Sequence, residues 1–219
     1  MRYIRNMEIR ICTYNGRTVR KPENYLIKCQ GCVFNCNLTE FFSMQLLDCV
    51  GTQYIIWPAE NAYLARGIAS LLKDTHPNNH SRGLLFVDFT HYYLSIFSND
   101  SWLNMLEKVP MDIILLADQT MEPLAHFWKN HDKRITDALS VRKHRPFSVK
   151  NRARIGSINR NRGIKPATLM EVKVLELLMS GHNAREVGEM LNISSKNVFN
   201  LQYSLERKLG KTLKEMIIL

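Results

Sequence analysis

Three helix-start signals near the C-terminal end constrain the fold of this chain more than any other feature of its sequence. Thr168-Leu-Met-Glu171 and Asn183-Ala-Arg-Glu186 each place a Glu three residues after an N-cap residue, which is the pattern of a capping box. Ser194 supplies a further N-cap after a short turn. The sequence therefore predicts two short capped helices joined by a tight turn, a helix-turn-helix, with one more helix before them.

The last of these helices, expected over residues 195–209, divides into two faces at 3.6 residues per turn. One face is apolar and is expected to pack as core: Val198, Leu201, Leu205 and Leu209. We call the opposite face the recognition face: Lys196, Asn200, Tyr203 and Arg207, with Phe199 at its edge. Asn can bond an adenine edge, Lys and Arg reach guanine or phosphate, and aromatic rings contact thymine methyl groups. These residues and Ser195 are the candidate DNA contacts, and an ordinary helical bundle with a solvated outer face is the alternative.

The net charge of +10 is concentrated in one segment. Residues 1–141 carry 14 basic and 14 acidic side chains, residues 142–166 carry nine basic and no acidic ones, and residues 167–219 carry seven and six. Because residues 142–166 also contain two Gly and two Pro and lack apolar periodicity, we interpret them as a linker. Four of its side chains are expected to contact DNA phosphates: Arg152, Arg154, Arg160 and Arg162. The alternative is a solvated hinge that binds nothing specific.

Residues 168–210 resemble the DNA-binding domain of LuxR/FixJ-type bacterial transcription regulators. The resemblance rests on the two capping boxes, the turn at Ile193-Ser194, the apolar positions between them and the ending Lys208-Leu209-Gly210. It implies that residues 195–209 enter the major groove and that a fourth helix, residues 212–219, helps to pair two such domains. The sequence departs from the family at three positions, Asn197, Phe199 and Leu201, where Thr, Lys and His are frequent. These departures predict weaker DNA binding that relies more on shape and methyl contacts.

Apolar runs before the linker predict an α/β domain. Residues 54–57, 83–88 and 111–117 have the composition of buried strands, and residues 61–73, 91–108 and 122–140 are expected to supply helices. Strands of this kind alternating with helices indicate a parallel sheet covered on both faces. The pattern resembles a degenerate receiver domain of response regulators, with residues 57–74 in place of the first strand-helix unit.

Asp88 lies near the position of a receiver's phosphate acceptor. A receiver also needs clustered carboxylates to hold a divalent metal, and here only Pro58-Ala59-Glu60 stands where the acidic pair belongs. We therefore expect Asp88 to be a strand-end residue of a domain that is not controlled by phosphorylation.

The five cysteines do not form a convincing metal site. Cys29, Cys32 and Cys36 have usable spacing, and Cys12 or Cys49 could be a fourth ligand, but no second pair accompanies them. We expect reduced structural thiols, with a metal or redox sensor as the alternative.

Several classes of protein do not fit the sequence. No apolar run approaches the roughly 20 residues of a membrane-spanning helix, and MRYIRNMEIR has no apolar signal core, so a cytoplasmic location is expected. No catalytic constellation and no Gly-rich phosphate loop is found, so we expect neither an enzyme nor a cofactor.

Together these observations predict an α/β, degenerate receiver-like N-terminal domain and an all-α C-terminal domain of four helices. The expected boundaries are 1–50 for an unassigned segment, 51–141 for the α/β domain, 142–166 for the linker and 167–219 for the helix-turn-helix domain. The layout resembles the enterobacterial accessory regulators of capsule, mucoid phenotype and fimbriae, of the RcsA, RmpA and EcpR type. That resemblance implies promoter DNA as ligand, and a homodimer or a heterodimer with an RcsB-type response regulator. The alternative is an interaction module that controls such a partner without recognising DNA itself.

Overall fold

The structure is a computed structural model of the 219-residue chain, and it describes residues 11–14, 17–20, 28–30, 54–58, 60–72, 84–107, 111–140 and 163–217. Of the first three segments and of residues 71–72, only the backbone is described. The predicted linker arginines, Cys32, Cys36 and Cys49 lie outside these residues.

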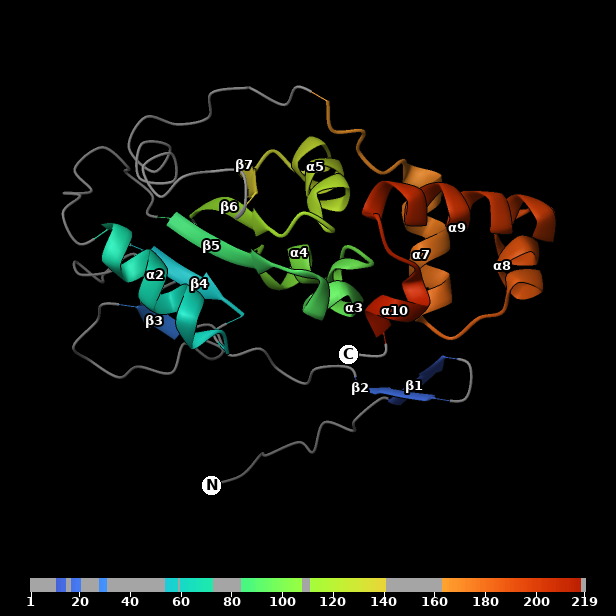
Figure 1. Cartoon of the computed structure of the whole chain (residues 1–219), viewed down its shortest axis with the longest axis horizontal. Coiled ribbons are helices and arrows are strands. Elements are labelled where there is room, and N and C mark those ends of the chain that lie inside the picture. Colours follow the sequence, from blue (N-terminus) through green and yellow to red (C-terminus); the bar gives the residue numbers. More distant parts are fainter. Residues whose placement is uncertain are drawn as a thin grey trace.

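A five-stranded sheet organises the first part of the chain (Figure 1). Its strands, in spatial order, are β3 (Lys28–Gln30), β4 (Tyr54–Trp57), β5 (Leu84–Phe89), β6 (Asp112–Ala117) and β7 (Ile135–Ser140). Strands β4 to β7 are parallel, which confirms the parallel sheet expected from the apolar runs. Strand β3 is antiparallel to β4 and comes from the N-terminal segment that the sequence left unassigned. A separate two-stranded hairpin consists of β1 (Ile11–Tyr14) and β2 (Arg17–Arg20).

Helices cover both faces of this sheet, as the continuous apolar strands require. Helix α2 (Ala62–Leu72) packs on the face that presents Ile56, Phe86 and Ile114. The opposite face carries the larger core and is covered by η1 (His91–Tyr93), α3 (Leu94–Phe97), α4 (Ser101–Met105) and α5 (Glu122–His131). Aromatic rings fill that core, among them Trp57 stacked on Trp102 with ring centroids 6.3 Å apart.

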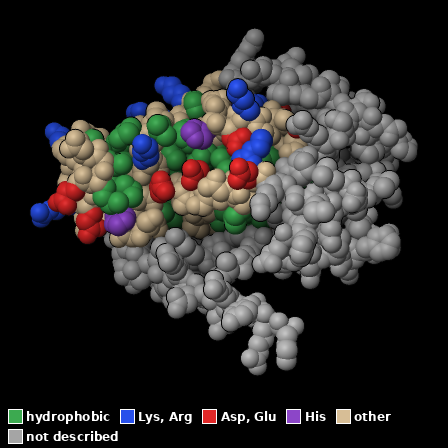
Figure 2. Space-filling model, turned by 180° about the vertical axis from the view of Figure 1, so that it is seen from behind, with side chains coloured by type: hydrophobic (Ala, Val, Ile, Leu, Met, Phe, Trp, Pro, Cys, Tyr) green, Lys and Arg blue, Asp and Glu red, His purple; other side chains and the backbone are tan. Residues whose placement is uncertain are grey.

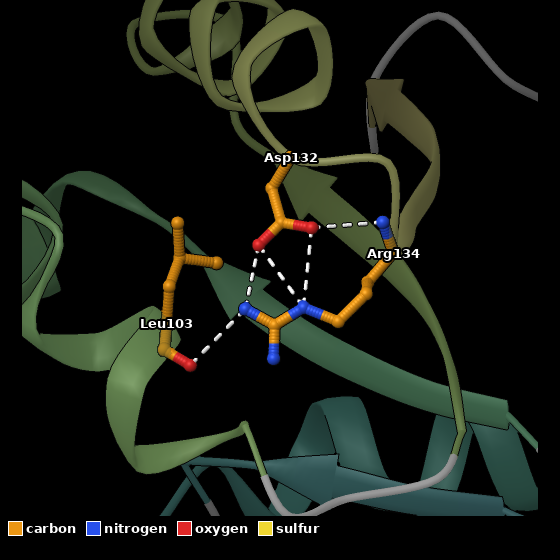
Figure 3. Close-up of polar contacts among 3 residues, drawn as sticks. All are labelled: Leu103, Asp132 and Arg134. Atoms are coloured by element: carbon orange, nitrogen blue, oxygen red, sulfur yellow. Dashed lines mark hydrogen bonds and ion pairs between the residues drawn. The ribbon is translucent and has the colours of Figure 1, made fainter.

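The expectation of a helix throughout residues 122–140 is wrong, because α5 ends at His131 and residues 135–140 form β7. The break is held by Asp132, whose carboxylate accepts hydrogen bonds from the backbone N of Arg134 at 2.8 Å and from its guanidinium at 2.6 and 3.1 Å (Figure 3). The guanidinium also donates to the carbonyl O of Leu103 at 3.3 Å, so the turn before β7 is tied to α4.

Four helices lie within the described residues 163–217: α7 (Leu169–Met179), α8 (Ala184–Leu191), α9 (Ser195–Leu209) and α10 (Leu213–Ile217). Both capping boxes are present where the sequence predicts them, with Thr168 and Asn183 as the N-caps of α7 and α8. Ser194 caps α9, accepting a hydrogen bond from the backbone N of Asn197 at 3.2 Å. Gly210, with φ of 72°, ends α9 in the left-handed conformation that glycine adopts without strain.

These helices pack against the sheet part of the chain rather than standing apart from it. The backbone N of Ala167 donates to the carbonyl O of Pro123 at 2.9 Å, and α9 and α10 contact α5 and η1 respectively. One continuous hydrophobic cluster includes Phe97 and Leu124 from the first part and Leu175 and Leu213 from the second. Burial raises the pKa of Glu176, and the charge of the Asp100 carboxylate raises it further.

Candidate nucleic-acid interface

The turn between α8 and α9 depends on a glycine that the sequence analysis did not single out. A Cβ on Gly188 would lie 2.7 Å from the carbonyl O of Ile193, and the backbone N of Ile193 donates to the carbonyl O of Gly188 at 2.9 Å. Asn192 completes the turn in the left-handed conformation, with φ of 54°. The signal available in the sequence is a glycine inside a short capped helix. Because Gly is unfavourable at such a position, its presence indicates that another backbone segment approaches the helix closely there.

The structure brings the predicted recognition face together on the outer side of α9. Phe199 and Tyr203 are 59% and 68% exposed, although aromatic side chains of this size are usually buried. Lys196, Asn200 and Arg207 are exposed as well, while Ser195 at the start of the helix is only partly exposed. The candidate side chains therefore share one solvent-facing surface, with Ser195 at its margin.

The apolar face of α9 packs against the other helices, and the prediction for Leu201 needs a correction. Val198, Leu205 and Leu209 are buried, whereas Leu201 is only partly buried and packs at the edge of the core. At about 100° per residue, Leu201 lies about 60° from the centre of the face that the other three define. Leu201 is therefore a flanking residue and not a central one.

A buried ionic network fixes α9 on α7. The Glu171 carboxylate, 2% exposed, accepts hydrogen bonds from the backbone N of Thr168 at 2.7 Å, from Nζ of Lys208 at 2.7 Å and from Oγ of Ser204 at 2.8 Å. Nζ of Lys208 also donates to the carbonyl O of Pro166 at 3.0 Å. Burial acts to raise the pKa of Glu171, but the hydrogen bonds from Lys208, Thr168 and Ser204 outweigh it and the pKa is lowered. The capping-box glutamate of α7 thus also holds the C-terminal part of α9.

Asp88, the residue near the position of a receiver's phosphate acceptor, lies at the carboxyl end of β5. Asp88 is 1% exposed, and its Oδ2 accepts a hydrogen bond from Nδ2 of Asn61 at 2.9 Å. Burial raises the pKa of the Asp88 carboxyl, and the charges of Asp118 and Glu60 raise it further. The Asp118 carboxylate is occupied locally, since it accepts from the backbone N of His91 at 3.0 Å and of Met121 at 2.9 Å.

Over the described part of the chain, no group of three or more His, Cys, Asp and Glu side chains is arranged to hold a metal ion. Among the helices that the structure describes, none is both long enough and apolar enough to cross a bilayer.

Comparisons with known proteins identify the family to which the first part of the chain belongs. A protein of Escherichia coli strain K12 named "Uncharacterized protein YqeH" is 25% identical over 198 residues, which cover 88% of this chain and 92% of that protein. A solved structure of RcsB from Salmonella enterica serovar Typhimurium, bound to promoter rprA in the presence of phosphomimetic BeF3−, aligns with 68% of this chain and 90% of its own. Its sequence identity is 18% and the TM-score is 0.31. The family model described as the EcpR N-terminal domain matches residues 28–152, from the first residue of β3 to beyond β7. Since this match spans more than half of the chain, the protein belongs to the EcpR N-terminal domain family.

Proposed function

We propose that this protein is a sequence-specific DNA-binding transcription regulator whose helix α9 enters the major groove, and that it is not an enzyme. The observation that carries the proposal is the division of α9 into a buried face and an exposed recognition face, on a helix with a cap at each end. A helix of 15 residues held in this way can present side chains to base edges without changing its own backbone.

Different side chains of the recognition face suit different parts of DNA. Asn200 is exposed about midway along the length of α9 and can form the bidentate bond with adenine that discriminates between bases. Lys196 and Arg207 lie toward its two ends, where contacts with phosphates would fix the position of the helix on the duplex.

The basic linker supports the affinity of this interface. In Figure 2, Lys and Arg side chains are scattered among hydrophobic and acidic ones over the described part of the face shown. The excess of positive charge in the sequence lies in residues 142–166. We propose that this segment contacts phosphates and adds affinity that does not depend on base sequence.

In biological terms, we propose an accessory activator of surface polysaccharide or fimbrial genes that acts in the cytoplasm without phosphorylation. Support for the target class comes from the family of the N-terminal region and from the resemblance of the whole layout to accessory regulators. Support for independence from phosphorylation comes from Asp88, which is buried and already bonded to Asn61. The protein is proposed to act as a homodimer or with an RcsB-type response regulator.

The test is binding of the full chain to genomic DNA fragments by fluorescence polarisation, with and without an RcsB-type partner. Asn200→Ala should relax specificity at one or two base pairs, by roughly 1–3 kcal/mol of discrimination, with the fold intact. Asn130→Ala is the matched control, because Asn130 is also an exposed helical Asn but lies on α5. Unchanged binding in Asn200→Ala and in Tyr203→Ala would contradict the proposal.

Two large aromatic side chains exposed on α9 favour a second candidate function. Such residues are frequent at protein interfaces, so the chain could control a partner regulator by pairing without recognising DNA itself. In the same experiment, this function predicts that the chain alone binds no fragment specifically and that it changes the binding of the partner.

A further inference from the structure

Phe199 and Tyr203 form an apolar pair on the recognition face. They lie four residues apart, so their Cα atoms are separated by about 6 Å along the helix axis and their side chains point to the same side. Their exposed fractions of 59% and 68% show that neither ring is used in the core of this chain. The pair is therefore available to a ligand.

The surroundings of the pair define the chemistry of that ligand. Lys196 precedes the pair, Arg207 follows it, and both are exposed. No acidic residue occurs between Ser195 and Leu205, and the carboxylate of Glu206 is occupied by Gln202 Nε2 at 3.0 Å and the backbone N of Leu213 at 3.0 Å. The face thus suits a ligand with negative charge at both ends and apolar groups between them.

The major groove of DNA has this arrangement wherever thymines are present. Phosphates line its edges, and the C5 methyl group of thymine is the apolar feature of its floor. Two base-pair steps rise about 6.8 Å along the duplex axis, compared with about 6 Å between the two residues along α9.

We propose that Phe199 and Tyr203 recognise the C5 methyl groups of thymines at two positions about two base pairs apart. This inference rests on the proposed function and adds to it the chemical group that is recognised. Uracil tests it cleanly, because uracil lacks only that methyl group and keeps the hydrogen-bonding edges of thymine.

The experiment uses the full chain and a duplex that it selects from a random-sequence pool. The duplex is then synthesised with each thymine replaced in turn by uracil, and affinities are measured by fluorescence polarisation. Replacement should lower the affinity about fourfold at each of the two contacted positions, as expected for losing one buried methyl group. Replacement at other thymines should have no effect.

Variants assign the effect to the two rings. Phe199→Ala and Tyr203→Ala should each weaken binding of the thymine duplex and each abolish the uracil effect at one position, which is the coupling expected of groups in contact. Tyr63→Ala is the matched control, since Tyr63 is 87% exposed but lies on α2, and it should leave both affinities unchanged.

The outcomes separate this inference from the proposed function. If the protein selects a duplex but uracil has no effect at any position, methyl recognition is refuted and DNA binding stands. If Phe199→Ala and Tyr203→Ala weaken thymine and uracil duplexes equally, the rings do not contact the methyl groups. If the full chain selects no sequence, both the inference and the proposed function fail.

Discussion

Two glutamates occupy the same position in two capping boxes, and they should differ sharply in their effect on stability. Glu171 and Glu186 each accept a hydrogen bond from the backbone N of their N-cap residue, at 2.7 and 2.8 Å. Only Glu171 is buried and paired with Lys208, whereas the side chain of Glu186 is 50% exposed. Replacing each by Gln therefore isolates the value of the buried network, because Gln is itself accepted at this position of a capping box.

The expected magnitude follows from the contacts. In Glu171→Gln, an amide group must face either the ammonium of Lys208 or the hydroxyl of Ser204, and the ion pair is lost. Breaking a buried ion pair costs about 3–5 kcal/mol, and we expect about 3, because Lys208 keeps its bond to the Pro166 carbonyl. Glu186→Gln should cost less than about 0.5 kcal/mol, as is usual for an exposed substitution that keeps its cap.

The assay is urea-induced unfolding of the full chain at pH 7, followed by circular dichroism. A pH series adds an independent check. Because the folded-state pKa of Glu171 is lowered, its contribution to stability is complete above its ordinary value of 4.5 and is lost as the pH falls through the lowered pKa. The difference between wild type and Glu171→Gln should therefore shrink below pH 4.5. Equal destabilisation by the two substitutions, or a difference that grows in acid, would refute this account of the network.

Four further outcomes are expected. Leu205→Ala should lower the free energy of unfolding by roughly 2–5 kcal/mol and Leu201→Ala by clearly less, since Leu205 is fully buried and Leu201 is not. Equal costs in denaturant titrations would contradict this assignment. Because burial raises the pKa of Asp88, its ionisation destabilises the fold, so the stability of wild type relative to Asp88→Asn should fall as the pH rises above 3.8; acetyl phosphate should not label wild type. Protein purified without chelator should contain no stoichiometric zinc or iron, and Cys32→Ser should keep regulation. Joint replacement of the linker residues Arg152, Arg154, Arg160 and Arg162 should weaken binding to all DNA sequences equally. It should also reduce the slope of log affinity against log salt concentration by about 0.9 per lost phosphate contact. A changed sequence preference with an intact slope would contradict this prediction.

The helix boundaries of the C-terminal part could be predicted because their causes are local. The caps at Thr168 and Asn183 act through residues three positions away, so the sequence contains the whole interaction. The division of α9 into two faces is local for the same reason, since it depends only on helical periodicity.

Features that depend on distant residues could not be predicted in this way. Strand β3 has three residues and exists through its pairing with β4, as in Lys28 opposite Ile56. The end of α5 lacks Gly and Pro, and the turn there depends on the bond between Asp132 and Arg134 and on the pairing of β7 with β6. The partner of Glu171 could not be predicted either, because Lys208 is 37 residues away in the sequence.

The sheet and the C-terminal helices share one hydrophobic core, which affects how much the segment between them matters for folding. Because the backbone N of Ala167 is hydrogen-bonded to Pro123 and α10 lies against η1, the two parts are held together by packing and not only by the segment between them. When two parts already contact each other, the entropic cost of joining them by a chain segment grows only with the logarithm of the segment's length. Doubling the length of the connection with a neutral sequence should therefore lower the free energy of unfolding by only about 0.6 kcal/mol, so the length of this segment should have little influence on folding.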